Sequence, residues 1–245
     1  MVQNKTAEKW NDRTELLIGS GGVARLAGAR VFVAGVGGVG GYAAEMLARS
    51  GTGHLTLVDA DCVSVTNLNR QLIATIPDIG RQKTELFRER FLSINPAIDV
   101  LAVSDFITPD NVAALLEPGY DYIVDCIDTV APKVALLAYC LHNRIPVISS
   151  MGAGGRLDPT KAGYADLWET REDGLARAVR QRLKKLGLRR PLRVVASSEA
   201  PRTGAVIALD ERNKRSSYGT LATIPSLFGI LLASKVINDL TSPHK

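Results

Sequence analysis

Cysteine is scarce in this chain of 245 residues, which contains only Cys62, Cys126 and Cys140 and no Cys-x-x-Cys spacing. A disulfide framework uses an even set of cysteines, and a structural zinc site uses closely spaced pairs. Neither is indicated here. We therefore expect a protein of a reducing compartment, the cytoplasm, without zinc and with its three thiols serving as packing residues.

Long apolar runs are also scarce. The N-terminal ten residues have no apolar stretch of signal-peptide length, so secretion is not expected. Residues 224–240 are strongly apolar, but Ser234 and Lys235 interrupt them, and a membrane helix needs about 20 apolar residues. We interpret this segment as a buried helix packed on a sheet or at a subunit interface, and we expect no membrane insertion.

The charge is small overall but unevenly placed. The chain has a net charge of +5 from 30 basic and 25 acidic residues. Nine basic and three acidic residues lie between Glu169 and Arg193, a local net charge of +6, so the rest of the chain is close to neutral. This segment is a candidate contact for a polyanion.

Apolar strand patterns alternate with helical ones between residues 31 and 150, which predicts a doubly wound, mostly parallel, Rossmann-like α/β sheet. Thr108 is expected to cap a helix that Pro109 opens. The expected strands are 31–35, 54–59, 98–103, 120–127 and 146–150, and the expected helices are 39–50, 80–94, 109–116 and 133–142.

The pattern after residue 150 is less regular. We expect a glycine-rich loop at 151–155 and, further on, a polar, mobile loop at 210–218. The other expected elements are a basic amphipathic helix at 174–186, strands at 191–196 and 205–209, and the helix at 224–240. We divide the chain into a regular α/β domain (1–160, with an N-terminal arm) and a basic region (161–245) that continues the same structural unit.

A Gly-x-Gly-x-x-Gly motif directly follows the first expected strand. Its glycines are Gly35, Gly37, Gly38 and Gly40. Such a turn lets phosphate oxygens approach backbone N–H groups at a helix N-terminus. Asp59, nineteen residues further on, ends the next strand, where its carboxylate can accept both ribose hydroxyls. The motif and Asp59 together predict nucleotide binding, and alone they would favour NAD.

The residues after Asp59 do not fit a dehydrogenase. Asn67, Arg70 and Gln71 follow shortly, and Lys83 lies on the next expected helix. A triphosphate carries more negative charge than a dinucleotide, and an arginine with a lysine can neutralise it while pyrophosphate departs. These residues therefore favour ATP over NAD.

This set of residues resembles the nucleotide site of the ubiquitin-activating-enzyme-like adenylating superfamily, which includes ThiF and MoeB. The resemblance implies that ATP binds with Mg²⁺ near Asp128, in the segment Cys126–Thr129, and that Arg70, Lys83 and Asp128 contact the phosphates. It also implies a homodimer in which Arg13 reaches the nucleotide bound by the partner subunit. Residues 1–160 would then form the ATP-binding adenylating domain, and residues 161–245 a basic, substrate-binding and dimer-supporting region.

Further motifs are similar to one branch of the superfamily, whose members cyclise threonylcarbamoyladenosine in tRNA. They include Arg13–Gly19, Asp105–Asn111, Gly152–Gly155 and Ser198–Ala200. This similarity implies that a carboxyl adenylate forms on tRNA, and that ring closure then expels AMP after pyrophosphate. It gives the basic segment an RNA-binding role, for which the candidates are Arg177, Arg180, Lys184 and Lys185, and it makes a sulfur-transfer protein a candidate partner.

Three alternatives remain at this point. The chain could adenylate the C-terminus of a sulfur-carrier or ubiquitin-like protein, although no cysteine follows Cys140 to form a thioester. It could be an NAD-dependent oxidoreductase, which Arg70 and Lys83 disfavour. It could also be an RNA-binding scaffold with a vestigial pocket, against which the complete set of nucleotide-site residues argues.

Overall fold

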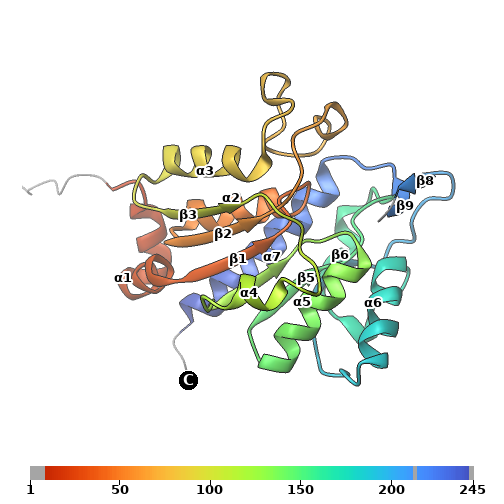
Figure 1. Ribbon diagram of the computed structural model, residues 1–245. Coiled ribbons are helices and arrows are strands. Elements are labelled where there is room, and N and C mark those ends of the chain that lie inside the picture. Colours follow the sequence, from red (N-terminus) through yellow and green to blue (C-terminus); the bar gives the residue numbers. More distant parts are fainter. Residues whose placement is uncertain (1–8, 212–213, 243–245) are drawn as a thin grey trace, which may run out of the picture.

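The computed structural model describes residues 9–211 and 214–242. The N-terminal residues on which the expectation about secretion rests lie largely outside this part. Seven strands form one sheet in the order β3-β2-β1-β4-β5-β7-β6, in which only β6 is antiparallel to its neighbour (Figure 1). The strands are β1 (Arg30–Ala34), β2 (His54–Val58), β3 (Asp99–Val103), β4 (Tyr122–Asp125), β5 (Val147–Ser150), β6 (Ala162–Asp166) and β7 (Arg193–Ser197). The predicted doubly wound sheet is confirmed.

Helices cover both faces of the sheet (Figure 1). They are α1 (Asp12–Gly28), α2 (Gly40–Ser50), α3 (Lys83–Ile94), α4 (Val112–Leu116), α5 (Val130–Asn143), α6 (Gly174–Lys185) and α7 (Thr223–Thr241). Side chains alternate across β1, so Val31 and Val33 pack with α2, α3 and α7, whereas Phe32 and Ala34 pack with α4 and α5. This alternation fixes which helices lie on which face.

The strand order reverses beside β1. β2 and β3 lie on one side of it, and β4, β5 and β7 lie on the other. Because these strands are parallel, the loops that follow β1 and β4 diverge and leave a crevice at the carboxyl edge of the sheet, where α/β proteins bind ligands. The glycine motif follows β1, and Asp128 follows β4.

Two sequence predictions in the connecting segments are wrong. The helix expected from Pro109 begins at Val112, because residues 108–111 form a separate turn in which Thr108 and Asn111 exchange hydrogen bonds between side chain and backbone. The expected loop at 210–218 is largely a two-stranded hairpin, β8 (Val206–Glu211) and β9 (Lys214–Tyr218); residues 212 and 213 lie outside the described part. Helix α1 and strand β6 were not predicted at all.

Helix α7 is long and apolar enough to cross a membrane by length and composition alone. In the structure it packs along α2 and also contacts α1 and the sheet. Ile224, Phe228, Leu232 and Val236 are buried at these contacts. The interpretation of this segment as a helix packed on the sheet is confirmed.

The three cysteines are all free thiols. Cys140 is buried, and burial raises its pKa to about 12. Burial also raises the pKa of Cys126, so both thiols are protonated and unreactive at neutral pH. The prediction that Cys62 is a packing residue is wrong, because this side chain is exposed.

Candidate functional site

The glycine motif makes a tight turn in which two positions favour glycine strongly. Gly35 has φ = 83°, and a Cβ atom on Gly40 would lie 1.8 Å from the carbonyl oxygen of Gly35. The chain therefore turns tightly and enters α2 at Gly40. The N-terminus of α2 faces the crevice, where its backbone N–H groups and helix dipole can attract phosphate.

Asp59 is hydrogen-bonded to this turn. One of its carboxylate oxygens accepts a hydrogen bond from Val36 N at 2.8 Å, and the other accepts one from Asp61 N at 2.9 Å. Burial raises the pKa of Asp59, and the nearby ammonium of Lys83 only partly offsets this effect. Each carboxylate oxygen can accept a second hydrogen bond, so Asp59 can also hold ribose hydroxyls.

Lys83 begins α3 and points back to the end of β2. Its Nζ lies 2.8 Å from Asp61 Oδ2 and 3.9 Å from Asp59 Oδ1, and its side chain is only 3% exposed. The structure thus joins Asp59 and Lys83, which are 24 positions apart in the chain. A nearly buried cation beside the glycine turn can bind a phosphoryl group strongly, because little water screens the charge of the lysine.

The segment from Asn67 to Gln71 covers the other side of the turn. Asn67 is buried and accepts a hydrogen bond from Ser64 N. Arg70 packs its methylene groups near Gly38 and donates to Thr66 O and Asn69 Oδ1. Gln71 is also buried, with its amide next to Gly37. Arg70 and Gln71 therefore border the glycine turn, and Asn67 holds the start of the segment that carries them.

Gln71 Oε1 is one of the few buried side-chain oxygens in the described residues that accept no hydrogen bond. An unmet buried acceptor costs stability unless a donor arrives. Because the amide lies against the glycine turn, a bound nucleotide or an ordered water is the natural source of that donor.

Asp128 lies in the exposed turn between β4 and α5, on the β4 side of the crevice. Sequence reasoning missed the buried group beneath this turn. Asp125 Oδ2 accepts hydrogen bonds from Lys133 Nζ and Ser149 Oγ, each at 2.6 Å, and Asp125 Oδ1 accepts one from Ile127 N. The lysine and the aspartate are fully buried. This group anchors the turn that carries Asp128.

Arg13 is exposed on the first turn of α1. Leu16 and Leu17, one turn further on, are 87% and 85% exposed. The structure places none of these residues in hydrogen-bonding or ion-pair contact with the glycine turn of the same chain. Two neighbouring leucines this exposed are typical of a surface that another molecule covers.

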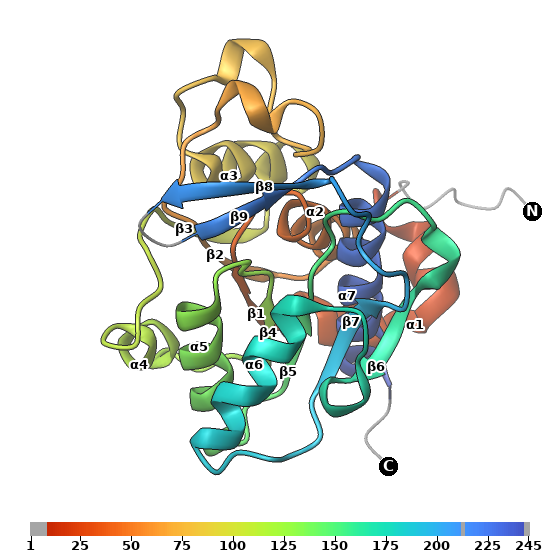
Figure 2. The same cartoon turned by 90° about the vertical axis from the view of Figure 1, so that its right-hand side faces the viewer.

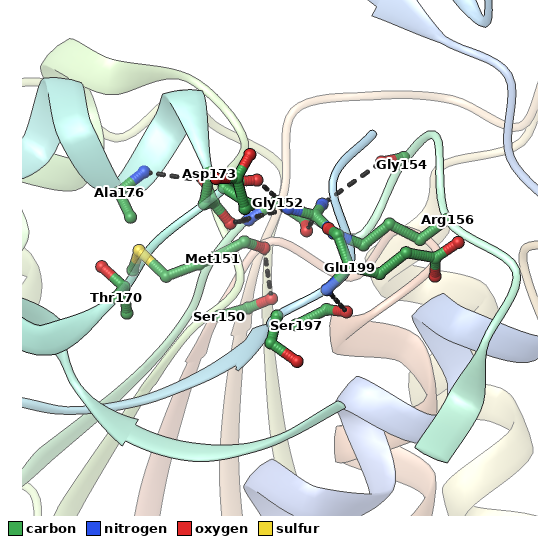
Figure 3. A network of polar contacts seen from close by, with 12 residues as sticks. Ser150, Met151, Gly152, Gly154, Arg156, Thr170, Asp173, Ala176, Ser197 and Glu199 are labelled. Carbon is green, nitrogen blue, oxygen red and sulfur yellow. Dashed lines mark hydrogen bonds and ion pairs between the residues drawn. The ribbon is translucent and has the colours of Figure 1, made fainter. Parts of the chain in front are cut away.

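A second polar network lies beside the glycine-rich loop 152–155 (Figure 3). Asp173 Oδ2 accepts a hydrogen bond from Gly152 N, and Asp173 Oδ1 accepts one from Ala176 N, each at 2.9 Å. One buried carboxylate thus holds the loop and also caps α6. Sequence reasoning missed this double role, because the loop and the helix are about 20 residues apart.

Arg156 completes the network. Its side chain is 2% exposed, and its guanidinium lies 3.5 Å from Asp173. It donates to four carbonyl oxygens, those of Gly152, Gly154, Glu172 and Glu199. These bonds join the loop after β5, the start of α6 and the segment after β7 into one rigid unit.

Helix α6 carries all four of the predicted RNA-contact residues. Its buried face is formed by Ala176, Val179 and Leu183. Arg177, Lys184 and Lys185 are exposed. The Arg180 guanidinium instead donates to Leu167 O and Thr170 Oγ1, so this arginine is largely engaged within the protein.

The fold and the site define a nucleotide-binding α/β protein whose ligand crevice lies at the switch point of the sheet. The chain belongs to the ThiF family, whose model matches residues 12–243. The resemblance to the adenylating superfamily is therefore confirmed.

Two curated relatives cover almost all of the chain. A tRNA threonylcarbamoyladenosine dehydratase of Escherichia coli is 39% identical over 96% of this chain and 95% of its own length. Another of Bacillus subtilis is 39% identical over 93% of both chains. A crystal structure of the E. coli enzyme, TcdA, in complex with ATP superimposes with a TM-score of 0.86 over 94% of both chains.

Proposed function

We propose that the protein is an ATP-dependent tRNA threonylcarbamoyladenosine dehydratase. The observation that carries the proposal is the contact of the glycine turn, Asp59 and Lys83 in one crevice, in a chain that matches enzymes of this name along almost its whole length. The solved relative was crystallised with ATP, which supports ATP as the nucleotide of this chain.

The proposed reaction has two displacements. An oxygen of the threonyl carboxylate attacks the α-phosphorus of ATP, and pyrophosphate leaves. A nucleophilic atom of the carbamoyl group then attacks the activated carbonyl carbon, and AMP leaves with the former carboxylate oxygen. The nucleoside loses one water in total. Because the second step is intramolecular, the protein contributes mainly by holding the two groups close together.

We assign the residues of the crevice to the nucleotide as follows. The glycine turn, Gly35, Gly37, Gly38 and Gly40, would hold phosphate oxygens. Asp59 would accept hydrogen bonds from the ribose, while Asn67 and Gln71 would border the bound nucleotide. Arg70 and Lys83 would neutralise the phosphates as negative charge moves onto the leaving pyrophosphate. Arg70 would have to exchange its bonds to Thr66 and Asn69 for phosphate oxygens.

A magnesium ion fits this arrangement. The described residues include no group of three or more His, Cys, Asp or Glu side chains that could form a protein cage for a metal. Mg²⁺ at ATP sites needs only one or two carboxylates, because phosphates and waters provide the other ligands. Asp128 would be that carboxylate. The ion would supply neutralisation of phosphate charge.

We further propose a cytoplasmic homodimer. The exposed Leu16 and Leu17 would be covered by a second copy, and Arg13 on the same helix turn would reach the partner's phosphates. Residues 1–160 would activate the substrate, and the basic region 161–245 would bind tRNA and support the dimer. The three free thiols agree with a reducing compartment.

The test is incubation with ATP, Mg²⁺ and tRNA carrying threonylcarbamoyladenosine, followed by mass spectrometry of the nucleosides. We expect a nucleoside that is lighter by one water, with AMP and pyrophosphate formed in equal amounts. An unchanged nucleoside would overturn the proposal. Adenylation of a sulfur-carrier C-terminus under the same conditions would favour the alternative instead.

A further inference from the structure

Three arginines surround a hollow far from the crevice. Arg144, Arg190 and Arg193 line a cavity of about 400 Å³. It lies where α5 ends and where β5 and β7 begin, so it is at the edge of the sheet opposite the glycine turn. The other lining residues are Cys140, Leu141, Ile145, Pro146, Val147, Pro191 and Leu192. No carboxylate is among the residues that line it.

Two of these arginines are held by the fold. The Arg190 guanidinium donates to Leu141 O at 3.0 Å, which fixes one edge of the group and leaves its other N–H donors for a ligand. Arg144 ends α5 in the left-handed region, with φ = 58°. Glycine or asparagine would adopt this conformation with less strain. Arg144 therefore has a fixed backbone at the end of α5, and it lines the same hollow as the anchored Arg190.

The hollow borders the apolar core that lies beneath the basic helix. Leu141 and Leu192 belong to the same apolar cluster as Val179 and Leu183, which form the buried face of α6. Figure 2 shows α6 beside α5, with the connection to β7 leaving its lower end. Twelve residues of α-helix span about 18 Å, so α6 leads from the Asp173–Gly152 contact towards the hollow.

Exposed basic residues occur at both ends of α6 and again at the hollow. Arg177 lies near the start of α6, Lys184 and Lys185 lie at its end, and the three arginines of the hollow follow. A small anion would occupy one point of such a path, whereas an extended polyanion can contact all of it. Guanidinium groups donate in pairs to phosphate oxygens, which suits a nucleic-acid backbone.

We propose that the hollow formed by Arg144, Arg190 and Arg193 binds backbone phosphates of the tRNA stem, so that the RNA follows α6 from the crevice to the opposite edge of the sheet. This inference rests on the proposed function, because it takes tRNA as the substrate. It adds a binding site that is separate from the nucleotide crevice and fixes the direction in which the RNA lies.

The test uses the full-length triple variant Arg144→Gln, Arg190→Gln, Arg193→Gln. Fluorescence anisotropy with labelled tRNA, over a series of salt concentrations, should show affinity at least about 10-fold weaker and a salt dependence reduced by about two to three released counterions. ATP affinity should stay the same. The matched control is Arg30→Gln, Arg49→Gln, Arg88→Gln, which removes the same charge from β1, α2 and α3 and should keep most of the salt dependence.

The corresponding triple Arg→Lys variant separates charge from geometry. We expect it to recover most of the salt dependence, because the charges return, but not the full affinity. Equal RNA affinity and salt dependence in the triple Gln variant and the wild type would overturn the site. Displacement of tRNA by poly-aspartate at equal charge concentration would also overturn the site, because it would show that the surface binds any polyanion.

These outcomes are independent of the chemical reaction. The binding measurement needs no turnover, so a weakened triple Gln variant together with an unchanged nucleoside in mass spectrometry would keep the RNA site and reject the dehydratase. The opposite pair of results would keep the dehydratase and reject the RNA site.

Discussion

The ammonium of Lys83 lies 2.8 Å from Asp61, which holds a nearly buried cation at the edge of the nucleotide crevice. The two partners differ sharply in environment, because the Lys83 side chain is 3% exposed and that of Asp61 is 63% exposed. When phosphate enters, Asp61 can turn into solvent while Lys83 stays. We therefore predict that Asp61 is a replaceable partner, which keeps the lysine paired until a nucleotide binds.

Substitutions of Lys83 and Asp61 should show that ATP turnover needs the lysine but not its ion pair with the aspartate. Lys83→Gln should lower ATP-dependent pyrophosphate release by at least about 100-fold, because it removes a cation from the leaving group. Asp61→Asn should leave the rate within about threefold, because only the resting partner is lost. Pyrophosphate release and thermal unfolding would be measured for both variants. Normal turnover of Lys83→Gln would refute the assignment.

The glycine turn offers a pair of alanine variants with different outcomes. In Gly40→Ala, the new Cβ would clash with the carbonyl oxygen of Gly35, and we expect a destabilisation of about 3 kcal/mol or more. In Gly37→Ala, the nearest atom would be 3.7 Å away, so the protein should fold normally. Its new methyl group should nevertheless block phosphate approach and weaken ATP binding. Urea unfolding and ATP titration check both results; tight ATP binding by Gly37→Ala would contradict the proposed turn.

The pH dependence of nucleoside binding should reveal Asp59. Burial raises its pKa above the ordinary 3.8, and only the ionised form can accept hydrogen bonds from both ribose hydroxyls. Affinity should therefore be constant at neutral pH and fall as the pH drops through the raised pKa, earlier than for an exposed aspartate. Calorimetry with adenosine avoids phosphate titration. Asp158→Asn, which removes a carboxylate outside the crevice, serves as the control, and a constant affinity down to about pH 4 would reject the role of Asp59.

Asp173 should matter for the tRNA step rather than for ATP. In Asp173→Asn the amide can accept at only one atom, so either the Gly152 bond or the α6 cap is lost. We expect kcat with tRNA to fall about 10-fold, with an unchanged KM for ATP. Asp158→Asn is the matched control, because Asp158 also caps a short helix but contacts neither Gly152 nor α6. An equal loss in both variants would indicate a general structural effect.

The proposed dimer predicts complementation between subunits. Arg13→Ala and Lys83→Gln should each be inactive alone. Mixed under conditions that exchange subunits, they should regain up to about a quarter of the wild-type rate, because half of the dimers are mixed and one of their two sites is intact. Rates of the mixture and of each variant would be compared. No recovery despite proven exchange would show that Arg13 does not act on the partner.

The nucleotide crevice could be predicted from sequence because its parts are local. The glycine turn occupies six consecutive positions, and Asp59 stands at the end of a strand whose neighbours are strongly apolar. In a parallel sheet, the residues at the carboxyl ends of the strands lie along the same edge, whatever the rest of the fold is. The residues that meet in the crevice could therefore be recognised by their positions at the ends of the predicted strands and helices.

The two buried ion pairs could not be predicted in the same way. Lys133 occurs in a helix pattern as an ordinary surface lysine, and only the packing of α5 on the sheet brings it to Asp125. Arg156 and Asp173 come from different loops. Strand β6, Ala-Gly-Tyr-Ala-Asp, has little β propensity of its own; its pairing with β7 defines it. Such features depend on tertiary contacts that no local pattern encodes.

The placement of β7 limits how this protein can be divided or transplanted. β7 comes after the basic helix in the chain, yet it pairs with β5, the strand that leads into the glycine-rich loop. Removing everything after residue 160 would uncover the backbone of β5 and would take away most of the buried residues of one apolar cluster. The basic region is therefore no detachable module: a chimera that exchanges it for another substrate-binding segment must also rebuild one edge of the catalytic sheet.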